Sequence, residues 1–305
     1  MAVRIYTDAS SNLYPSILKK KDADIVVLPM TLRIEGKEYH CYSDNIDVEK
    51  MSQDFYEEMK NGAKPQTALV SPGFFLSKCE EDIARGNEVI YITLSSGISG
   101  TYQSALLMAK EANEKAGKEA VKVLDSKTAG LGEGRIALKA YEYAREGLSF
   151  TEVISKIEKY IEIVRSEFTV DSIKYLANTG RVSNFKALIA GVLSIKPLLY
   201  GSKEGKIEVT SKAHGRKNAL KKLAEQVNEN IVNKDQTVYI AHCNSLLDAQ
   251  YLEHVLHEFG IDHTEIYFYD LVTGAHVGPG TIAVFYEGKN RDIPRKSVIS
   301  SLFGK

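Results

Sequence analysis

Short apolar runs that alternate with longer amphipathic stretches constrain the fold of the first half of the chain most strongly. The apolar runs are continuous rather than alternating, which is typical of parallel strands buried on both faces. They are Val3–Tyr6, Ile25–Leu28, Glu88–Leu94 and Val121–Leu124. The helical stretches are one that begins at Ser71-Pro72, then Thr101–Glu114, Gly134–Arg145 and Phe150–Val164. This half therefore predicts a three-layer α/β/α domain with a mainly parallel sheet.

The second half has a different pattern. Strands are expected at Glu167–Val170, Ile195–Tyr200, Lys206–Thr210, Thr237–Ala241, Thr264–Phe268 and Thr281–Tyr286. The second and third of these flank a glycine-containing turn and predict an antiparallel hairpin. Long helices are expected over Gly215–Asn230 and Ser245–Phe259. This half predicts a two-layer α+β domain with a mixed sheet.

The chain length supports this division, because 305 residues suit about two domains. We place the first domain over residues 1–165, with a β-hairpin insertion near residues 31–40, and the second over residues 166–305.

Charge and cysteine content exclude several classes of protein. Lys and Arg total 39 against 40 Asp and Glu, so no net positive charge draws the chain to nucleic acid. Three scattered cysteines form neither a disulfide framework nor a metal pattern, which favours a cytoplasmic location. The first residues do not resemble a signal peptide. The apolar run 187–195 is about half the roughly 20 residues that a membrane-spanning helix needs.

Glycine-rich and histidine-containing stretches do not match cofactor or metal motifs. Gly130–Gly134 lacks the third glycine of a dinucleotide fingerprint, since Arg135 stands there. Gly201–Gly205 lacks the spacing of a P-loop. His254 and His257 share a helix without the carboxylate of a zinc motif. No cofactor and no metal are therefore expected.

Three segments carry candidate binding residues. Leu94–Thr101 joins a strand to a helix, so its backbone N–H groups and hydroxyls can receive an anion at the helix N-terminus. Lys64–Pro72 holds Thr67 on a connection stiffened at both ends by proline. Thr273–Gly280 surrounds His276 with three glycines and a proline, and its imidazole can donate to an anion or move a proton. Each segment also has a purely structural interpretation. The first can be an ordinary capped turn, Thr67 can be an ordinary loop threonine, and the segment around His276 can be a rigid turn.

Several motifs in a fixed order resemble the DegV family over essentially the whole chain. They are Tyr6-Thr-Asp-Ala-Ser-Ser11, Tyr42-Ser-Asp-Asn-Ile-Asp47, Ser95-Ser-Gly-Ile-Ser-Gly-Thr-Tyr-Gln-Ser104, Leu124-Asp-Ser-Lys-Thr-Ala129, Gly180-Arg-Val182, Ile195-Lys-Pro197, Gly215-Arg216 and His276-Val-Gly-Pro-Gly280.

The resemblance implies that the chain binds a long-chain fatty acid in an apolar tunnel between its domains. It implies that Thr67, Ser96 and His276 hold the carboxylate, with Ser95, Gly97 and Gly278 also lining the ligand site. Candidate residues for the wall of the tunnel are Leu188, Ile189, Val192 and Leu193.

The resemblance also implies a partner. Some members present the lipid to a separate ATP-binding fatty acid kinase subunit, and Arg181 would then face that subunit or the phosphate. The chain itself would not be an enzyme, and it could contact a membrane transiently to exchange lipid. Two alternatives are a lipid-sensing regulator without a kinase, and a hydrolase or phosphotransferase that uses Ser96 and His276.

One departure from the family pattern affects the head-group region. Ala68-Leu69-Val70 stands where the family usually has Ser-Gln-Pro, so a hydroxyl and an amide are absent beside Thr67. A weaker carboxylate contact or a different preferred lipid is expected from this change.

Overall fold

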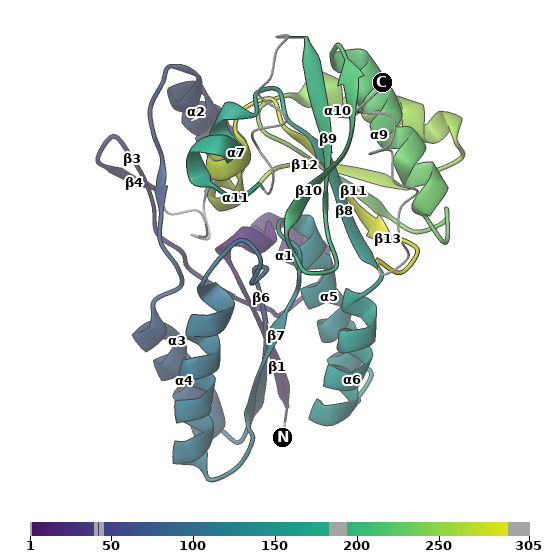
Figure 1. Cartoon of the computed structure of the whole chain (residues 1–305). Helices are drawn as coiled ribbons and strands as arrows, with labels where there is room; N and C mark the ends of the chain where they lie inside the picture. Colours follow the sequence, from purple (N-terminus) through teal and green to yellow (C-terminus); the bar gives the residue numbers. More distant parts are fainter. Residues whose placement is uncertain (1, 40–41, 43–45, 183–193, 292–305) are drawn as a thin grey trace, which may run out of the picture.

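Two domains stacked end to end make up the molecule (Figure 1). The computed structural model describes residues 2–39, 42, 46–182 and 194–291. The parallel sheet of the first domain lies in the lower half of Figure 1 and the second domain in the upper half. Within the described residues the architecture is the predicted one, an α/β domain with a parallel sheet followed by an α+β domain with a mixed sheet.

The first domain is built on a four-stranded parallel sheet in the order β2-β1-β6-β7. Its strands are β1 (Val3–Asp8), β2 (Val26–Leu28), β6 (Glu88–Thr93) and β7 (Val121–Asp125). Because every pairing is parallel, the carboxyl ends of the strands lie along one edge of the sheet. That edge faces the second domain (Figure 1).

Helices cover both faces of this sheet. They are α1 (Pro15–Lys20), α3 (Pro72–Ala84), α4 (Thr101–Ala116), α5 (Leu131–Arg145) and α6 (Phe150–Ile161). On one face, Phe75 and Ala109 from α3 and α4 pack with Val89 of β6. On the other, α5 and α6 share a core with Ile5 and Ile92. The predicted three layers are confirmed.

The second domain contains a six-stranded sheet in the order β10-β9-β8-β13-β11-β12. Its strands are β8 (Val164–Thr169), β9 (Ile195–Gly201), β10 (Ile207–His214), β11 (Val238–His242), β12 (Thr264–Phe268) and β13 (Ile282–Glu287). The β11–β12 pair is parallel and the other pairs are antiparallel, so the sheet is mixed.

Helices cover one face of this sheet, and the first domain covers the other. The helices are α9 (Arg216–Asn230) and α10 (Leu246–Glu258). Along β13, Ile282 and Val284 point into the core beneath these helices. Ala283 and Phe285 point into the core shared with α5. Successive strand residues face opposite sides, so this alternation shows that both faces are buried.

A small antiparallel sheet with one helix interrupts the first domain between β2 and α3. It contains β3 (Leu32–Ile34), β4 (Lys37–Tyr39), β5 (Gln66–Thr67) and α2 (Val48–Lys60). This insertion packs on the second domain. The Tyr56 hydroxyl of α2 donates to the carbonyl of Tyr269 at 3.2 Å, and the Tyr175 hydroxyl donates to the carbonyl of Met59 at 3.3 Å.

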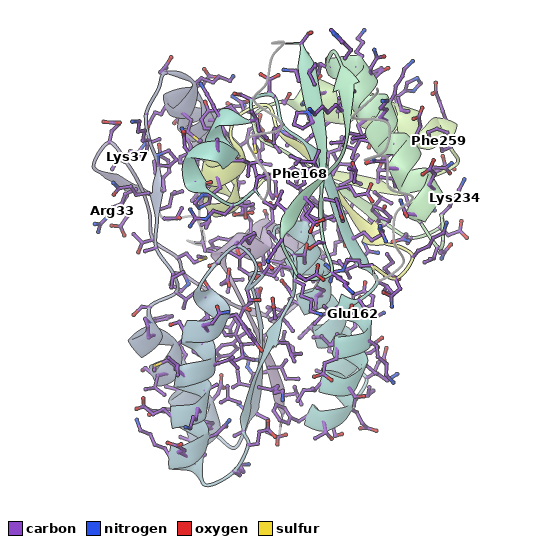
Figure 2. All side chains as sticks on the ribbon, in the orientation of Figure 1. Arg33, Lys37, Glu162, Phe168, Lys234 and Phe259 are labelled. Carbon is purple, nitrogen blue, oxygen red and sulfur yellow. The ribbon has the colours of Figure 1, made fainter. Side chains whose placement is uncertain are left out.

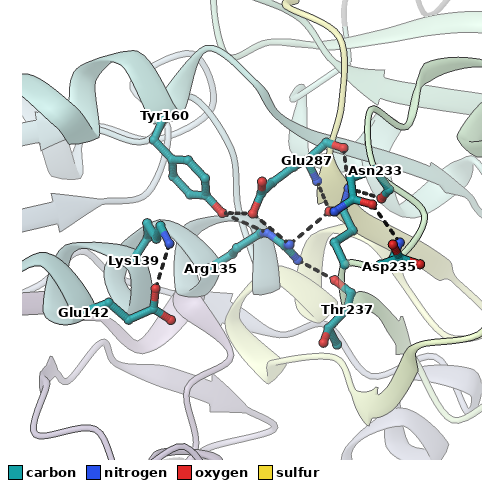
Figure 3. A network of polar contacts seen from close by, with 9 residues as sticks. Arg135, Lys139, Glu142, Tyr160, Asn233, Asp235, Thr237 and Glu287 are labelled. Atoms are coloured by element: carbon teal, nitrogen blue, oxygen red, sulfur yellow. Dashed lines mark hydrogen bonds and ion pairs between the residues drawn. The ribbon is translucent and has the colours of Figure 1, made fainter.

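A buried arginine also joins the two domains (Figure 3). Arg135 of α5 donates to the carbonyl of Thr237 at 2.7 Å and to Glu287 Oε1 at 3.1 Å. The Tyr160 hydroxyl also donates to Glu287, at 2.7 Å. Glu162 lies at the same junction (Figure 2) and pairs with Lys127 at 2.7 Å. Polar groups therefore fix the position of one domain against the other.

Candidate functional site

The carboxyl edge of the parallel sheet carries the loop that contains Ser95, Ser96 and Gly97. In open α/β sheets, ligands bind outside the carboxyl ends of the strands. Here that edge is formed by the ends of β1, β6 and β7, at Asp8, Thr93 and Asp125. The second domain closes over it, so any ligand held at this edge lies between the domains.

The loop from Leu94 to Gly100 connects this edge to the second domain. The Ser95 hydroxyl donates to the carbonyl of Gly205 at 2.7 Å and accepts from the amide of Gly97 at 3.1 Å. A side chain on Gly97 would collide with the backbone of Gly205. Ser95 and Gly97 therefore hold the loop against the β9–β10 hairpin.

Ser96 is held by an acidic residue of the neighbouring strand. Its amide donates to Asp125 Oδ1 at 3.0 Å, and its hydroxyl donates to Asp125 Oδ2 at 2.5 Å. The amide of Lys127 also donates to Asp125 Oδ1, at 3.0 Å. In the described residues, Ser96 makes no hydrogen bond to Thr67 or His276, so a serine–histidine pair for hydrolysis is not formed.

Thr67 and His276 meet although 209 residues separate them in the sequence. The Thr67 hydroxyl and His276 Nε2 lie 3.0 Å apart. Burial, and to a lesser degree the positive charge of Arg181, lowers the pKa of His276 to about 4, so the imidazole is neutral at pH 7. Its Nδ1 is buried and has no partner in the described structure.

The short helices α11 (Leu271–Val277) and α7 (Lys174–Thr179) position His276 and the segment before Arg181. A short helix, not a turn, surrounds His276, and Asp270 caps it by accepting from the amide of Thr273 at 2.6 Å. Glycine is required within this helix and after it. A side chain at Gly274 would strike Tyr56, and one at Gly278 would strike Tyr175.

Arg181 lies on a groove of about 330 Å³ at the domain boundary. The groove is lined by Gly97, Ile98, Gly180, Arg181, Val182 and Lys206. A bridge between Val182 and Ile207 places Arg181 beside Lys206. Arg181 donates to the carbonyl of Thr179 at 2.5 Å, and neither cation has a carboxylate partner within the described residues.

The departure at residues 68–70 has a structural counterpart. Val70 is buried with Phe75 in the core beneath α3, whereas Leu69 is 42% exposed. The amide of Ala68 donates to the carbonyl of Thr31 at 2.9 Å, which extends the pairing of β5. The buried side chain of Val70 and the backbone bond of Ala68 therefore hold the strand of Thr67 in place.

The residues expected to line the tail tunnel lie outside the described residues: Leu188, Ile189, Val192 and Leu193. Two residues of the site were not anticipated from the sequence, Asp125 and Lys206. Asp125 stood in a recognised motif, but only the alignment of β6 with β7 shows that it contacts Ser96.

Among the residues that the structure describes, no group of three or more His, Cys, Asp or Glu side chains could hold a metal ion. Among the same residues, no helix has both the length and the apolar character needed to cross a membrane.

Comparison with known proteins assigns the family. The family model described as "Uncharacterised protein, DegV family" matches residues 2–289. The chain belongs to the DegV family. A DegV domain-containing protein of Clostridium perfringens is 35% identical over 290 residues, covering 94% of this chain and 98% of the relative.

Solved DegV structures share the fold. A Ruminococcus gnavus DegV protein with vaccenic acid has a TM-score of 0.80 and 26% identity, covering 93% of this chain and 99% of its own. A fatty acid binding DegV protein of Streptococcus agalactiae has a TM-score of 0.79 and 26% identity, covering 95% of this chain and 100% of its own.

Proposed function

We propose that this DegV protein binds a long-chain fatty acid, with the carboxyl group beside Thr67, Ser96 and His276 and the tail between the domains. The observation that carries the proposal is the Thr67–His276 pair, a hydroxyl and a neutral imidazole 3.0 Å apart at the domain boundary. Two structural relatives at 26% identity are described with a fatty acid or as binding one, which supports the same ligand class.

The electrostatics suit an acidic head group. A buried carboxylate needs hydrogen-bond donors and a compensating charge. His276 donates through Nε2 to Thr67 when the proton sits on that nitrogen, and the Thr67 hydroxyl is then free to donate to the ligand. Arg181 supplies positive charge close enough to lower the pKa of His276.

The apolar tail supplies most of the affinity. A tail of about 16 carbons buries about 15 methylene or methyl groups at roughly 0.8 kcal/mol each, or about 12 kcal/mol before costs. Ordering the chain and losing its translation offset several kcal/mol of this gain. The polar residues therefore set the position of the head group, and the tail retains the ligand.

The protein then presents the acid to a separate ATP-binding kinase subunit, and it does so in the cytoplasm. The sequence lacks a phosphate-binding loop, so the phosphoryl donor must be held elsewhere. Arg181 and Lys206 line the groove at the domain boundary. Within the described residues neither has a carboxylate partner, so both can receive an anionic phosphoryl group or an acidic partner surface.

Lipid extraction and binding measurements test the ligand. The purified protein is expected to carry one or a few fatty acids, identified by native mass spectrometry and extraction. Thr67→Val should weaken fatty acid binding by about 10- to 150-fold, the loss of one hydrogen bond to a charged group. Thr151→Val, at an exposed position of α6, is the control and should leave the affinity unchanged. An empty protein that takes up no added fatty acid would reject the proposal.

Kinase coupling is tested separately. Arg181→Ala should reduce acyl-phosphate formation with an ATP-binding fatty acid kinase subunit much more than it weakens fatty acid binding, to which Arg181 contributes only its charge. Equal losses of lipid binding and turnover would instead place Arg181 at the ligand. A lipid-loaded protein that supports no acyl-phosphate formation would favour a lipid-sensing regulator.

A further inference from the structure

Asp125 uses both carboxylate oxygens to hold the loop that carries Ser96. Oδ1 accepts the amides of Ser96 and Lys127, each at 3.0 Å. Oδ2 accepts the Ser96 hydroxyl at 2.5 Å. Asp125 is the last residue of β7, paired in register with Thr93 at the end of β6, so two buried strands fix the carboxylate beneath the loop.

This arrangement determines what Ser96 can offer to a ligand. A serine hydroxyl has one hydrogen and two lone pairs, whereas an ionised carboxylate only accepts hydrogen bonds. Since the hydrogen is donated to Asp125, the Ser96 oxygen presents lone pairs alone. A fatty carboxylate also presents lone pairs alone, so it gains no hydrogen bond from Ser96 in this geometry. A head group that carries a hydrogen does gain one.

We propose that Asp125 is a positioning residue that makes Ser96 a hydrogen-bond acceptor, so that this part of the site favours a hydroxyl-bearing head group. The ligand class is a long-chain alcohol or a fatty acid in its protonated form. The inference rests on the proposed function, because it concerns the head group of the same ligand. Thr67 and His276 remain the contacts for an ionised carboxylate.

An asparagine at position 125 would reverse the polarity of Ser96 without changing its shape. The amide oxygen of Asn can accept the amides of Ser96 and Lys127, as Asp125 Oδ1 does. The amide nitrogen, in the place of Oδ2, then donates to the Ser96 oxygen. The Ser96 hydrogen is released and can be donated to a carboxylate. Asp125→Asn therefore changes which ligand is preferred.

The test measures the affinities of hexadecanoic acid and 1-hexadecanol at pH 7.5 for wild type, Ser96→Ala, Asp125→Asn and the double variant. Asp125→Asn should raise the affinity for the acid by about tenfold relative to the affinity for the alcohol, the scale of one hydrogen bond to a charged group. The double variant should lose this gain, because the gain passes through the Ser96 hydroxyl. Ser99→Ala in the same loop is the control and should leave the acid-to-alcohol ratio unchanged.

Two results would overturn the inference while the proposed function stands. The first is a gain in Asp125→Asn that persists in the double variant, which would assign it to removal of negative charge alone. The second is a Ser96→Ala variant whose affinity for the acid falls at least as much as its affinity for the alcohol. Because Asp125 is unchanged in this variant, the result tests whether Ser96 acts as an acceptor even if Asp125→Asn fails to fold. A wild type that binds neither ligand rejects the proposed function and the inference together.

Discussion

Buried titratable side chains at single positions give the protein its dependence on pH. His276 and His242 are both largely buried, and burial lowers the pKa of each to about 4. Glu133 is fully buried beside Asp8, and burial followed by the Asp8 charge raises the pKa of Glu133 well above its usual value. Lowering the pH reduces the contribution of these histidines to the free energy of unfolding and increases that of Glu133, so mutation can separate the two effects.

The histidines should destabilise the fold in acid. Between about pH 6.5 and pH 4 the unfolded chain binds protons at these positions and the folded chain does not, so the free energy of unfolding falls as the pH falls. Denaturant titrations at pH 7 and pH 5 measure the difference, and His276→Gln should reduce it. The NMR titration of the His276 ring checks the cause, since a midpoint near 6.5 would contradict it.

Glu133 should have the opposite effect. Thr7 donates to one of its oxygens at 2.8 Å, and the Ser10 hydroxyl lies 2.9 Å from the other and 2.5 Å from Asp8. One serine hydrogen cannot serve both carboxylates, which agrees with a protonated Glu133. Glu133→Gln should therefore fold and be at least as stable as wild type at pH 8. Glu133→Ala leaves the Thr7 hydroxyl without its carboxyl partner, while Ser10 keeps its bond to Asp8, and should lose about 1–3 kcal/mol in the same denaturation assay.

At the scale of elements, helix α11 depends on close packing that only glycine permits. Gly278 has φ +84° and ψ 166° and lies against the ring of Tyr175. Gly215 has nearly the same backbone, φ +78° and ψ 157°, but nothing within 4 Å of an added side chain. The two positions can be compared directly. An added side chain meets the same unfavourable backbone conformation at both, but only at Gly278 does it collide with a neighbour, the ring of Tyr175.

Gly278→Ala should therefore lose more stability than Gly215→Ala. The difference should be about 1–3 kcal/mol, the usual cost of an overpacked site. Gly278→Ala should also weaken fatty acid binding, because the collision displaces α11 and with it His276. Thermal denaturation and lipid titration of both variants measure these effects. Equal losses in the two variants would show that the contact with Tyr175 adds nothing to the destabilisation.

Elements with a strong local signal could be predicted from the sequence, and those that depend on distant contacts could not. The strand at residues 88–93 was evident because it is a continuous apolar run, and α3 because Ser71 and Pro72 begin it. Helix α11 was missed because Gly274 and Gly278 favour a turn locally, whereas Tyr56 and Tyr175 determine their conformation.

The same limit applies to the candidate site. Thr67 and His276 were both singled out, but their contact depends on β5 and α11 coming together from far apart in the sequence. The Ser96–Asp125 contact depends on the alignment of two neighbouring strands. Residue types could therefore be anticipated, while hydrogen-bond partners required the three-dimensional arrangement.

At the scale of the whole molecule, Arg135 contributes to making the two domains one cooperative unit. Arg135→Met should cost about 2–4 kcal/mol, less than the full penalty for breaking a buried pair, because the Glu287 side chain is 32% exposed. Arg145→Met on the same helix is the control, since the Arg145 and Asp22 side chains are 56% and 90% exposed, and it should change stability by less than about 0.5 kcal/mol. Calorimetry checks both values, and an unchanged melting profile for Arg135→Met would contradict this role.

The insertion between β2 and α3 has a consequence for synthesis on the ribosome. Tyr56 of α2 bonds to the backbone of Tyr269, which is made 213 residues later. At roughly 5–20 residues per second, the partner surface of α2 is completed roughly 10–40 seconds after α2 itself. Phe55, Tyr56 and Met59 are all buried in the folded protein. Until the second domain is made, part of their apolar surface is exposed to solvent. A nascent chain paused in this interval is the form of the protein that a chaperone would most readily engage.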